Sequence, residues 1–373
     1  MTERIAPPDT VMVAIVGALV ALGLVMVFSA SSATAYAFHH DTAYFLKRQL
    51  MWLVVALLCA ALAYKLDYRV LRKLGAPILV AAMLALVAVL VPHVGIMSGG
   101  ARRWIGAGGF AFEPSEFAKL ALVIYLAATL SRRQEKIRSF THGIVPLAIV
   151  SFTVAVLVLR EPDMGTATLL VFVAFAIFFI AGARLPHLFV TVLAISPVIA
   201  YEVLSSPYRR ARIFAFVDPW KDAQNTGFHI VQSLLALGSG HIFGVGLGLS
   251  RQKFFYLPEQ YTDFIFSIVG EELGLLGTLV VVGLFLCFAY RATKIALTAP
   301  DTFGFFLVAG CTALIVIQAF VNIGVATSSW PVTGVPLPFI SFGGSSLIVS
   351  LVAVALILNV GRQRYRNVRA APR

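Results

Sequence analysis

The sequence predicts an all-α polytopic membrane protein with about ten transmembrane helices and a long extracytoplasmic segment between the seventh and eighth helices. Of the 373 residues, 60% are hydrophobic and only 12% are charged, which is far from the composition of a soluble domain. The apolar residues fall in runs of about 20, the length that crosses a bilayer. The net charge of +12 comes from short basic blocks between these runs, as in topology signals rather than nucleic-acid binding.

Ten apolar runs are expected to span the membrane, the shorter ones with the help of flanking residues. They are centred within residues 11–30, 50–64, 76–94, 117–130, 144–159, 167–183, 186–204, 264–290, 303–326 and 345–360. The first run exceeds the roughly 7–15 apolar residues of a signal peptide, so we expect it to remain as an uncleaved span. Residues 1–373 are therefore expected to form a single transmembrane domain.

Lysine and arginine predict the orientation, because they accumulate in short cytoplasmic loops. With the N-terminus inside the cell, the inner segments hold basic clusters within residues 65–73, 132–138 and 362–373. The short outer loops hold only Lys47, Arg48, Arg102, Arg103 and Arg160. Both termini are therefore expected in the cytoplasm.

The segment of about residues 205–262 is too long for a simple connection between two spans. It carries basic residues, glycine-rich turns and a short helix candidate, "HIVQSLLALG". Loops of this length are usually functional or disordered, and the apolar content argues against disorder. The glycine-rich "GSGHIFGVGLGLS" lacks the lysine and spacing of a phosphate-binding P-loop, so it predicts turns. We expect the segment to pack on the outer face.

On this topology the unusual polar residues gather at the outer ends of the helices. They are Arg102, Arg103, Glu113, Glu116, Lys119, Asp163, Asp263, Ser345 and Ser346. Charged side chains in or beside a membrane are costly and usually functional, so a site on the outer face is predicted. Glu116 and Lys119 are three residues apart and share one helical face. This pair either serves the site or locks two helices together.

Asp263 is the candidate for chemistry, because it opens the eighth span at a boundary that water can reach. A stripe of small residues follows it down one helical face. The stripe consists of Ser267, Gly270, Gly274 and Gly277. Such stripes indicate close helix packing, or alternatively a groove for a lipid tail. Glu271 and Glu272 lie deeper and point elsewhere, so we expect them to pair with polar groups on other spans.

At these motifs the chain resembles the SEDS family (shape, elongation, division and sporulation), the polytopic peptidoglycan glycosyltransferases. The matching strings are "GARRWI", "PSEFAKLA", "EPDMGTA", "ALGSG", "GVGLGLSRQKFFYLPEQYTDFIFSIVGEELG" and "PVTGVPLPFISFGGSS". The strings "FSASS" and "SEFAKLA" favour the FtsW-like branch over the RodA-like branch. Two positions depart from the family pattern: Glu113, where a glutamine is usual, and His241, where a glycine is common. Glu113 adds an acid near the predicted site.

The resemblance implies polymerisation of lipid II, the undecaprenyl-diphosphate-linked disaccharide-pentapeptide, at the outer face of the bacterial cytoplasmic membrane. On this hypothesis Asp263 is the general base for the acceptor sugar hydroxyl, and the donor is attacked with inversion. Arg103 and Lys119, with Arg102, would stabilise charge on the diphosphate, while Glu116 orients Lys119. The full set of implied substrate-binding residues is Arg102, Arg103, Glu116, Lys119, Asp163, Ser345 and Ser346.

The resemblance also implies a partner, a class B penicillin-binding protein that crosslinks the new strands. No cofactor is certain. A divalent cation, Mg²⁺ or Mn²⁺, on the diphosphate is compatible with the resemblance, but the sequence shows no dedicated site for one. The three cysteines lie in apolar runs without paired spacing, and the seven histidines are scattered, so neither suggests a metal site.

Two other functions remain open for such a chain. A lipid II flippase would be expected to carry polar groups along its whole route and often shows repeat symmetry. Here the charges cluster at one face, and no repeat is evident. A non-catalytic scaffold for a penicillin-binding protein would not need an acid and several cations at one membrane depth.

Overall fold

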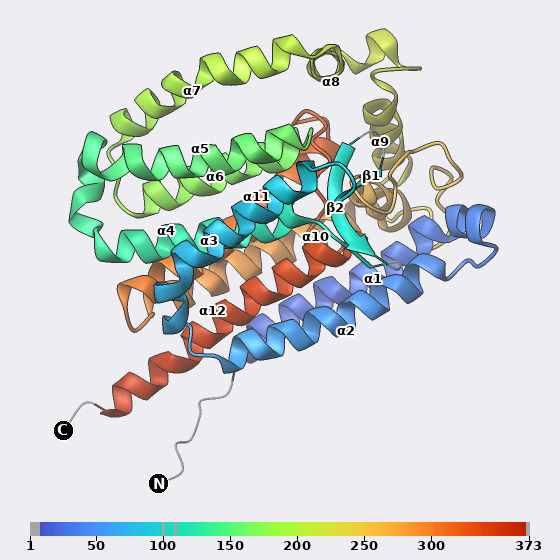
Figure 1. The fold of residues 1–373 in the computed structure, drawn as a ribbon. Helices are drawn as coiled ribbons and strands as arrows, with labels where there is room; N and C mark the ends of the chain where they lie inside the picture. The colour runs from blue at the N-terminus through green and yellow to red at the C-terminus, as the bar shows by residue number, and fades with distance from the viewer. Residues whose placement is uncertain (1–7, 99–100, 108–109, 371–373) are drawn as a thin grey trace.

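The computed structural model describes residues 8–98, 101–107 and 110–370. Within them, all ten predicted runs form helices, and all but the seventh pack as one bundle (Figure 1). They are α1 (Thr10–His39), α2 (Tyr44–Lys65), α3 (Arg69–Leu90), α4 (Pro114–Arg132), α5 (Val145–Arg160), α6 (Met164–Ile180), α7 (Leu185–Ser205), α10 (Ile265–Leu297), α11 (Thr302–Ala326) and α12 (Gly344–Ala370). A short 3₁₀ turn (Gln134–Arg138) and a π turn (Phe140–Ile144) join α4 to α5.

Aspartate caps begin three of these helices. The side chains of Asp9, Asp163 and Asp301 accept hydrogen bonds from the backbone N–H groups of the first turns of α1, α6 and α11. Each cap satisfies an N–H group that has no partner within the helix. Pro114 occupies the first turn of α4, where its missing N–H costs nothing. Short polar residues between apolar runs therefore set these helix starts.

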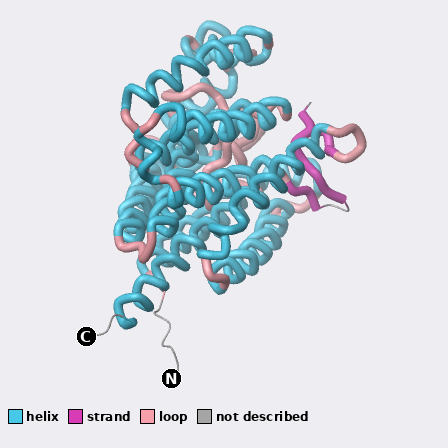
Figure 2. The backbone as a smooth tube through the Cα atoms, turned by 60° about the vertical axis from the view of Figure 1, so that its left-hand side comes forward, coloured by secondary structure: helices cyan, strands magenta, loops and turns pink. Residues whose placement is uncertain are grey.

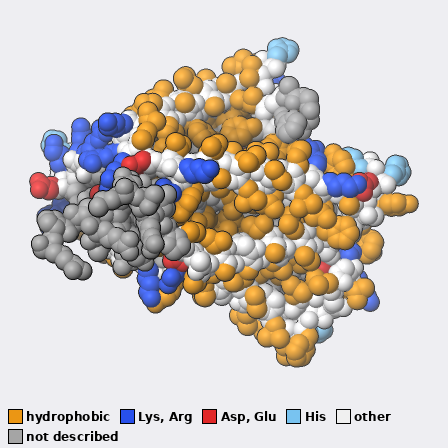
Figure 3. Space-filling model, turned by 90° about the horizontal axis from the view of Figure 1, so that it is seen from below, with side chains coloured by type: hydrophobic (Ala, Val, Ile, Leu, Met, Phe, Trp, Pro, Cys, Tyr) orange, Lys and Arg blue, Asp and Glu red, His pale blue; other side chains and the backbone are white. Residues whose placement is uncertain are grey.

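The membrane character of the bundle follows from length and composition. Eight helices of the described chain are long and apolar enough to span a bilayer. The other two expected spans are α6, which has 17 residues, and α4, which carries charges in its first half. On the face shown in Figure 3, hydrophobic side chains cover a broad middle band, and charged side chains gather at the two ends. This is the surface expected of a multi-pass membrane protein.

The middle of the bundle is built around α4. Most of its residues are buried, and it packs against α3 and α11, while α12 packs along α2. By contrast, α7 lies at the edge, separated from the main bundle in Figure 1, and most of its side chains are exposed. Polar residues on α4 and α11 are therefore enclosed by protein rather than lipid.

A small antiparallel sheet, absent from the sequence prediction, precedes α4. Its strands β1 (Gly95–Ser98), β2 (Ala101–Ala107) and β3 (Phe110–Phe112) pair in chain order. The strands are too short for an alternating pattern to stand out. The sheet lies at the end of the bundle away from both termini (Figures 1 and 2). It carries the "ARRW" arginines on a strand instead of a loop.

The long segment between α7 and α10 contains more helix than expected. It forms α8 (Pro207–Val217), a 3₁₀ turn (Pro219–Asp222) and α9 (Phe228–Ser239). The predicted helix candidate "HIVQSLLALG" lies within α9, and the glycine-rich stretch after it forms turns with positive φ at Gly244, Gly246 and Gly248. The segment lies at the same end of the bundle as the sheet (Figure 1).

The small-residue stripe predicted along α10 is interrupted at Gly274. Its φ of 68° and ψ of −166° break the helix, and the turn of residues 241–246 fills the gap with backbone hydrogen bonds. The bonds run from the N–H groups of Val245, Gly246, Leu275 and Leu276 to the carbonyls of Glu271, Glu272, His241 and Ile242. A Cβ at Gly274 would lie 2.3 Å from the nitrogen of Gly244. At Gly270 and Gly274 the stripe therefore serves close packing, the first of the two predicted roles.

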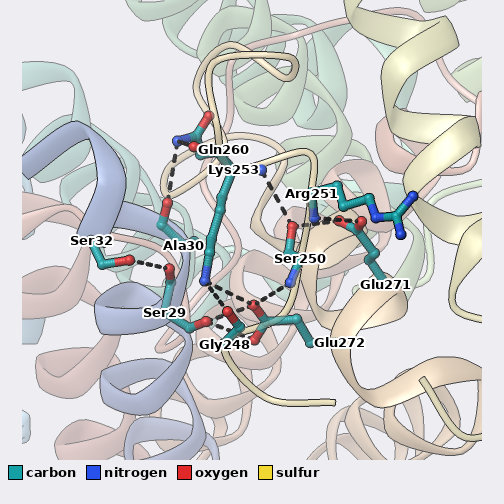
Figure 4. A network of polar contacts seen from close by, with 10 residues as sticks. All are labelled: Ser29, Ala30, Ser32, Gly248, Ser250, Arg251, Lys253, Gln260, Glu271 and Glu272. Carbon is teal, nitrogen blue, oxygen red and sulfur yellow. Dashed lines mark hydrogen bonds and ion pairs between the residues drawn. The ribbon is translucent and has the colours of Figure 1, made fainter. Parts of the chain in front are cut away.

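The side chains of Glu271 and Glu272 anchor the next part of the outer segment to the bundle (Figure 4). Both oxygens of Glu272 accept from Ser29 Oγ on α1, at 2.6 and 2.7 Å, and the Lys253 ammonium lies 3.8 Å away. Glu271 accepts from Ser250 Oγ at 2.5 Å and from the backbone N–H of Arg251 at 2.9 Å. Glu272 thus pairs with another span as predicted, whereas Glu271 pairs with the outer segment.

Candidate active site

Asp263 lies directly before α10, in a stretch of backbone that two other elements hold in place. Asn322 Nδ2 on α11 donates to the Asp263 carbonyl at 2.7 Å and to the Val335 carbonyl at 2.8 Å. Ser341 Oγ donates to the neighbouring Thr262 carbonyl at 2.5 Å. These contacts use the backbone of residues 262–263. The half-buried Asp263 side chain is therefore positioned without depending on its own carboxylate.

The loop of residues 331–343 covers this position. Gly334 has a φ of 78°, and a Cβ there would lie 3.5 Å from Asp263 Oδ2. One residue earlier, the Thr333 carbonyl lies so close to Gly165 on α6 that a Cβ at Gly165 would approach it to 2.2 Å. The loop therefore joins the start of α6, next to Asp163, to the start of α10, next to Asp263.

Glu116 and Lys119 form a buried ion pair one layer below. Lys119 Nζ donates to Glu116 Oε1 at 2.8 Å and to Gln318 Oε1 on α11 at 2.9 Å, and the Lys119 side chain is fully buried. Gln318 in turn donates to the Pro336 carbonyl at 2.9 Å. The pair therefore links α4, α11 and the covering loop. Of the two predicted roles, the locking of helices has direct geometric support.

Arg102 and Arg103 are neighbours on β2, at an irregularity in the sheet where Arg102 pairs with Met97, Trp104 pairs with Ile96 and Arg103 is left between them. Arg103 Nε donates to the Glu161 carbonyl at 3.1 Å, and its Nη2 donates to the Pro162 carbonyl at 2.5 Å. These carbonyls end α5, where a cation is favourable. Arg103 is thereby held beside Asp163, which caps α6. The structure brings Arg103 to the site, while Arg102 pairs with Met97 of β1 in the sheet.

Ser345 and Ser346 begin α12 and are buried. Ser345 Oγ accepts from the backbone N–H of Glu113, at 3.1 Å, and Ser346 Oγ accepts from Gln318 Nε2 at 3.4 Å. Both hydroxyls therefore contact protein groups that hold α12 against α4 and α11. A contribution of either serine to substrate binding would therefore be indirect, through the position of α12.

Two acids at the site, Asp263 and Glu113, have raised pKa values. Burial raises the pKa of Asp263 to about 7, with a further rise from Glu259 and Asp163, while Arg212 and Arg103 oppose it. Burial also raises the pKa of Glu113 to about 8, helped by Glu116 and Asp163. Glu113 is therefore mostly a neutral carboxylic acid at pH 7, like the glutamine that the family pattern has there. Asp263 titrates near neutrality, as suits a general base.

The structure adds residues that the sequence analysis did not single out. Glu161 is fully buried, neither of its oxygens has a hydrogen-bond partner among the described residues, and burial raises its pKa to about 8. Gln318 and Asn322 on α11 form hydrogen bonds with Lys119 and with the Asp263 carbonyl. Arg212 on α8 adds a positive charge that lowers the pKa of Asp263. Gln318 and Asn322 are polar and four residues apart in an otherwise apolar run, a signal that places both on one face of a helix.

A bound divalent cation finds no ready-made set of ligands. Over the described ranges, no group of three or more histidine, cysteine, aspartate or glutamate side chains is placed to hold a metal ion.

The comparisons with known proteins all indicate one family. The profile of the FtsW/RodA/SpoVE family, described as cell cycle proteins, matches residues 9–366. The chain is 44% identical over 363 residues to stage V sporulation protein E of Bacillus subtilis, covering 97% of this chain and 99% of that protein. It is 45% identical over 352 residues to a probable peptidoglycan glycosyltransferase FtsW of Geobacter metallireducens, covering 94% of each.

Solved structures extend the similarity to the fold. One chain, from work on the structural coordination of polymerization and crosslinking by a peptidoglycan synthase complex, superposes with a TM-score of 0.78 at 32% identity. That match covers 96% of this chain and 99% of the other. The rod shape determining protein RodA of Thermus thermophilus superposes with a TM-score of 0.69 at 31% identity, covering 96% and 98%. The sequence relatives named above are FtsW and SpoVE proteins, in agreement with the predicted FtsW-like branch.

Proposed function

This chain belongs to the FtsW/RodA/SpoVE (SEDS) family, and on that premise we propose that it polymerises lipid II into glycan strands at the outer face of the bacterial cytoplasmic membrane. It is a peptidoglycan glycosyltransferase, the activity named for its FtsW relatives. The single observation that carries the proposal for this site is Asp263, a half-buried acid under the loop of residues 331–343, whose pKa burial raises to about 7 while the charges of Arg212 and Arg103 lower it.

The proposed reaction is an inverting transfer. The acceptor sugar hydroxyl forms a bond to the anomeric carbon of the donor, and the bond from that carbon to the diphosphate oxygen breaks. The hydroxyl proton passes to the Asp263 carboxylate, so the base must be ionised at the start. Undecaprenyl diphosphate leaves with the bonding electrons, and its developing charge needs cations.

Of the cations predicted from the sequence, Arg103 is the one whose charge lowers the pKa of Asp263. Lys119 is bound to Glu116 and Gln318 within the bundle. We therefore assign Lys119 and Glu116 a positioning role, through Gln318 and the covering loop, instead of direct contact with the diphosphate. Arg102, next to Arg103 on β2, is kept as a second proposed cation for the diphosphate. Asp163 would orient a sugar hydroxyl beside the start of α6.

The membrane orientation is part of the proposal. Both termini lie at one end of the bundle, and the sheet, α9 and the 205–262 segment lie at the other (Figures 1 and 2). With the basic clusters at the termini in the cytoplasm, the end that carries Asp263 faces outward. The partner proposed there is a class B penicillin-binding protein, since a similar solved chain comes from a peptidoglycan synthase complex that couples polymerization with crosslinking.

The function is tested with the purified full-length chain, co-purified with its cognate transpeptidase. Labelled lipid II is supplied at the outer face of proteoliposomes, and glycan strands are separated by length. We expect strands to form from this side, with release of undecaprenyl diphosphate, and no movement of lipid II across the membrane. Movement of lipid II without strand formation would favour a flippase. Neither activity, under conditions where another polymerase works, would favour a scaffold.

A further inference from the structure

Arg212 on α8, which the sequence analysis did not single out, contacts the loop of residues 331–343 that covers Asp263. Its Nη1 donates to the Val332 carbonyl at 3.3 Å, two residues before Gly334, which covers Asp263. The Arg212 side chain is half-buried, whereas Arg210 is exposed. Residues two apart on a helix point in widely different directions. Arg212 therefore faces the loop of residues 331–343, and Arg210 faces away from it.

The charge of Arg212 acts on the proposed base. It lowers the pKa of Asp263, against burial. On α9, burial lowers the pKa of His229, and the charge of Arg212 lowers it further. Arg103 lowers the pKa of Asp263 as well, from β2 and the α5–α6 turn. Asp263 therefore lies within the field of two guanidinium groups carried by separate elements. Asp163 and Glu259 provide the opposing negative charge.

Binding of a diphosphate beside Asp263 requires more than one cation. It brings negative charge to a place that already holds Asp163, Glu259 and Asp263, so its binding is unfavourable unless arginine or lysine offsets the repulsion. Lys119 is bound to Glu116 and Gln318 below. Guanidinium groups suit phosphate because their donors form paired hydrogen bonds to two oxygens.

We propose that Arg212 is a substrate-binding residue that holds the diphosphate of the lipid donor together with Arg103, beside the loop of residues 331–343 that covers Asp263. This proposal rests on the proposed function and names a residue that serves it. Its consequence is that α8, which follows the exposed helix α7, forms part of the active site. The segment of residues 205–262 then contributes to substrate binding as well as to the outer surface.

The test measures binding of undecaprenyl diphosphate to the full-length protein in nanodiscs. Arg212→Ala removes the charge and the contact with Val332, whereas Arg212→Gln removes the charge but keeps an N–H donor for that carbonyl. Both variants should raise the Kd about tenfold or more, as expected for a lost charged contact. Arg210→Ala, the matched control on the same helix, should bind like the wild type. Wild-type affinity in Arg212→Gln would overturn the proposal.

A second readout separates binding from a general structural defect. Because Arg212 lowers the pKa of Asp263, both substitutions should move the acidic limb of the polymerisation rate to higher pH, and Arg210→Ala should leave it in place. A lower rate with an unmoved limb and an unchanged Kd would show a structural role and contradict the proposal. Wild-type protein that binds undecaprenyl diphosphate but makes no glycan would contradict the proposed function and leave the Arg212 comparison intact. Wild type that does not bind the lipid would contradict both.

Discussion

Asp263→Asn is expected to reduce glycan polymerisation by about 10²- to 10⁴-fold, the usual contribution of a general base. Asparagine has nearly the same shape but cannot accept the hydroxyl proton. The rate is measured with lipid II under single-turnover conditions, which separate transfer from product release.

The substitution should leave the fold intact, which makes the result interpretable. Asn322 and Ser341 hold the backbone carbonyls of residues 262–263, and an asparagine side chain leaves both contacts unchanged. Equal thermal unfolding and equal co-purification of the transpeptidase provide the control. A variant that keeps more than a tenth of the wild-type rate would remove Asp263 from the role of base.

Lys119→Ala is expected to destabilise the protein by about 3–5 kcal/mol, because it leaves the buried Glu116 carboxylate without its cation. Glu116 Oε2 already lacks a partner within the described structure, so no second group is placed to replace the ammonium. Thermal or denaturant unfolding in detergent measures the loss. Polymerisation should fall with it, since Gln318 and the covering loop lose their anchor on α4.

Two comparisons make the Lys119 result specific. The double variant Lys119→Met with Glu116→Gln removes both charges and should recover most of the lost stability, because neutral side chains of similar size can replace a buried pair. Lys47→Ala breaks an exposed pair with Asp41 and should change stability little. Unfolding of Lys119→Ala at the wild-type temperature would mean that the pair is not needed for the fold.

Local signals predicted the parts of the structure that depend on neighbouring residues. Apolar runs identified the ten long helices α1–α7 and α10–α12, and the three-residue spacing of Glu116 and Lys119 predicted their contact. The helix candidate in the outer segment is α9. Each of these features depends on periodicity or spacing within a few turns, which the sequence displays directly.

Contacts between distant residues could not be predicted in the same way. Gln318 lies 199 residues from Lys119, and the Arg212 contact with Val332 spans 120 residues. No spacing rule connects such positions. The break at Gly274 was missed for a related reason, because the backbone partners that stabilise it come from residues 241–246. Glu161 looked like a loop residue, since only the packed structure shows that it is buried.

The measurement that tests the central claim most directly is the pH dependence of the single-turnover transfer rate. Asp263 must be ionised to accept a proton, and its pKa is raised to about 7. The rate should therefore rise by about tenfold per pH unit on the acidic side and level off above about pH 7. Glu259→Gln should move this limb to lower pH, because Glu259 raises the pKa of Asp263. A rate that stays constant through this range, or a limb that Glu259→Gln leaves in place, would contradict catalysis by the Asp263 carboxylate.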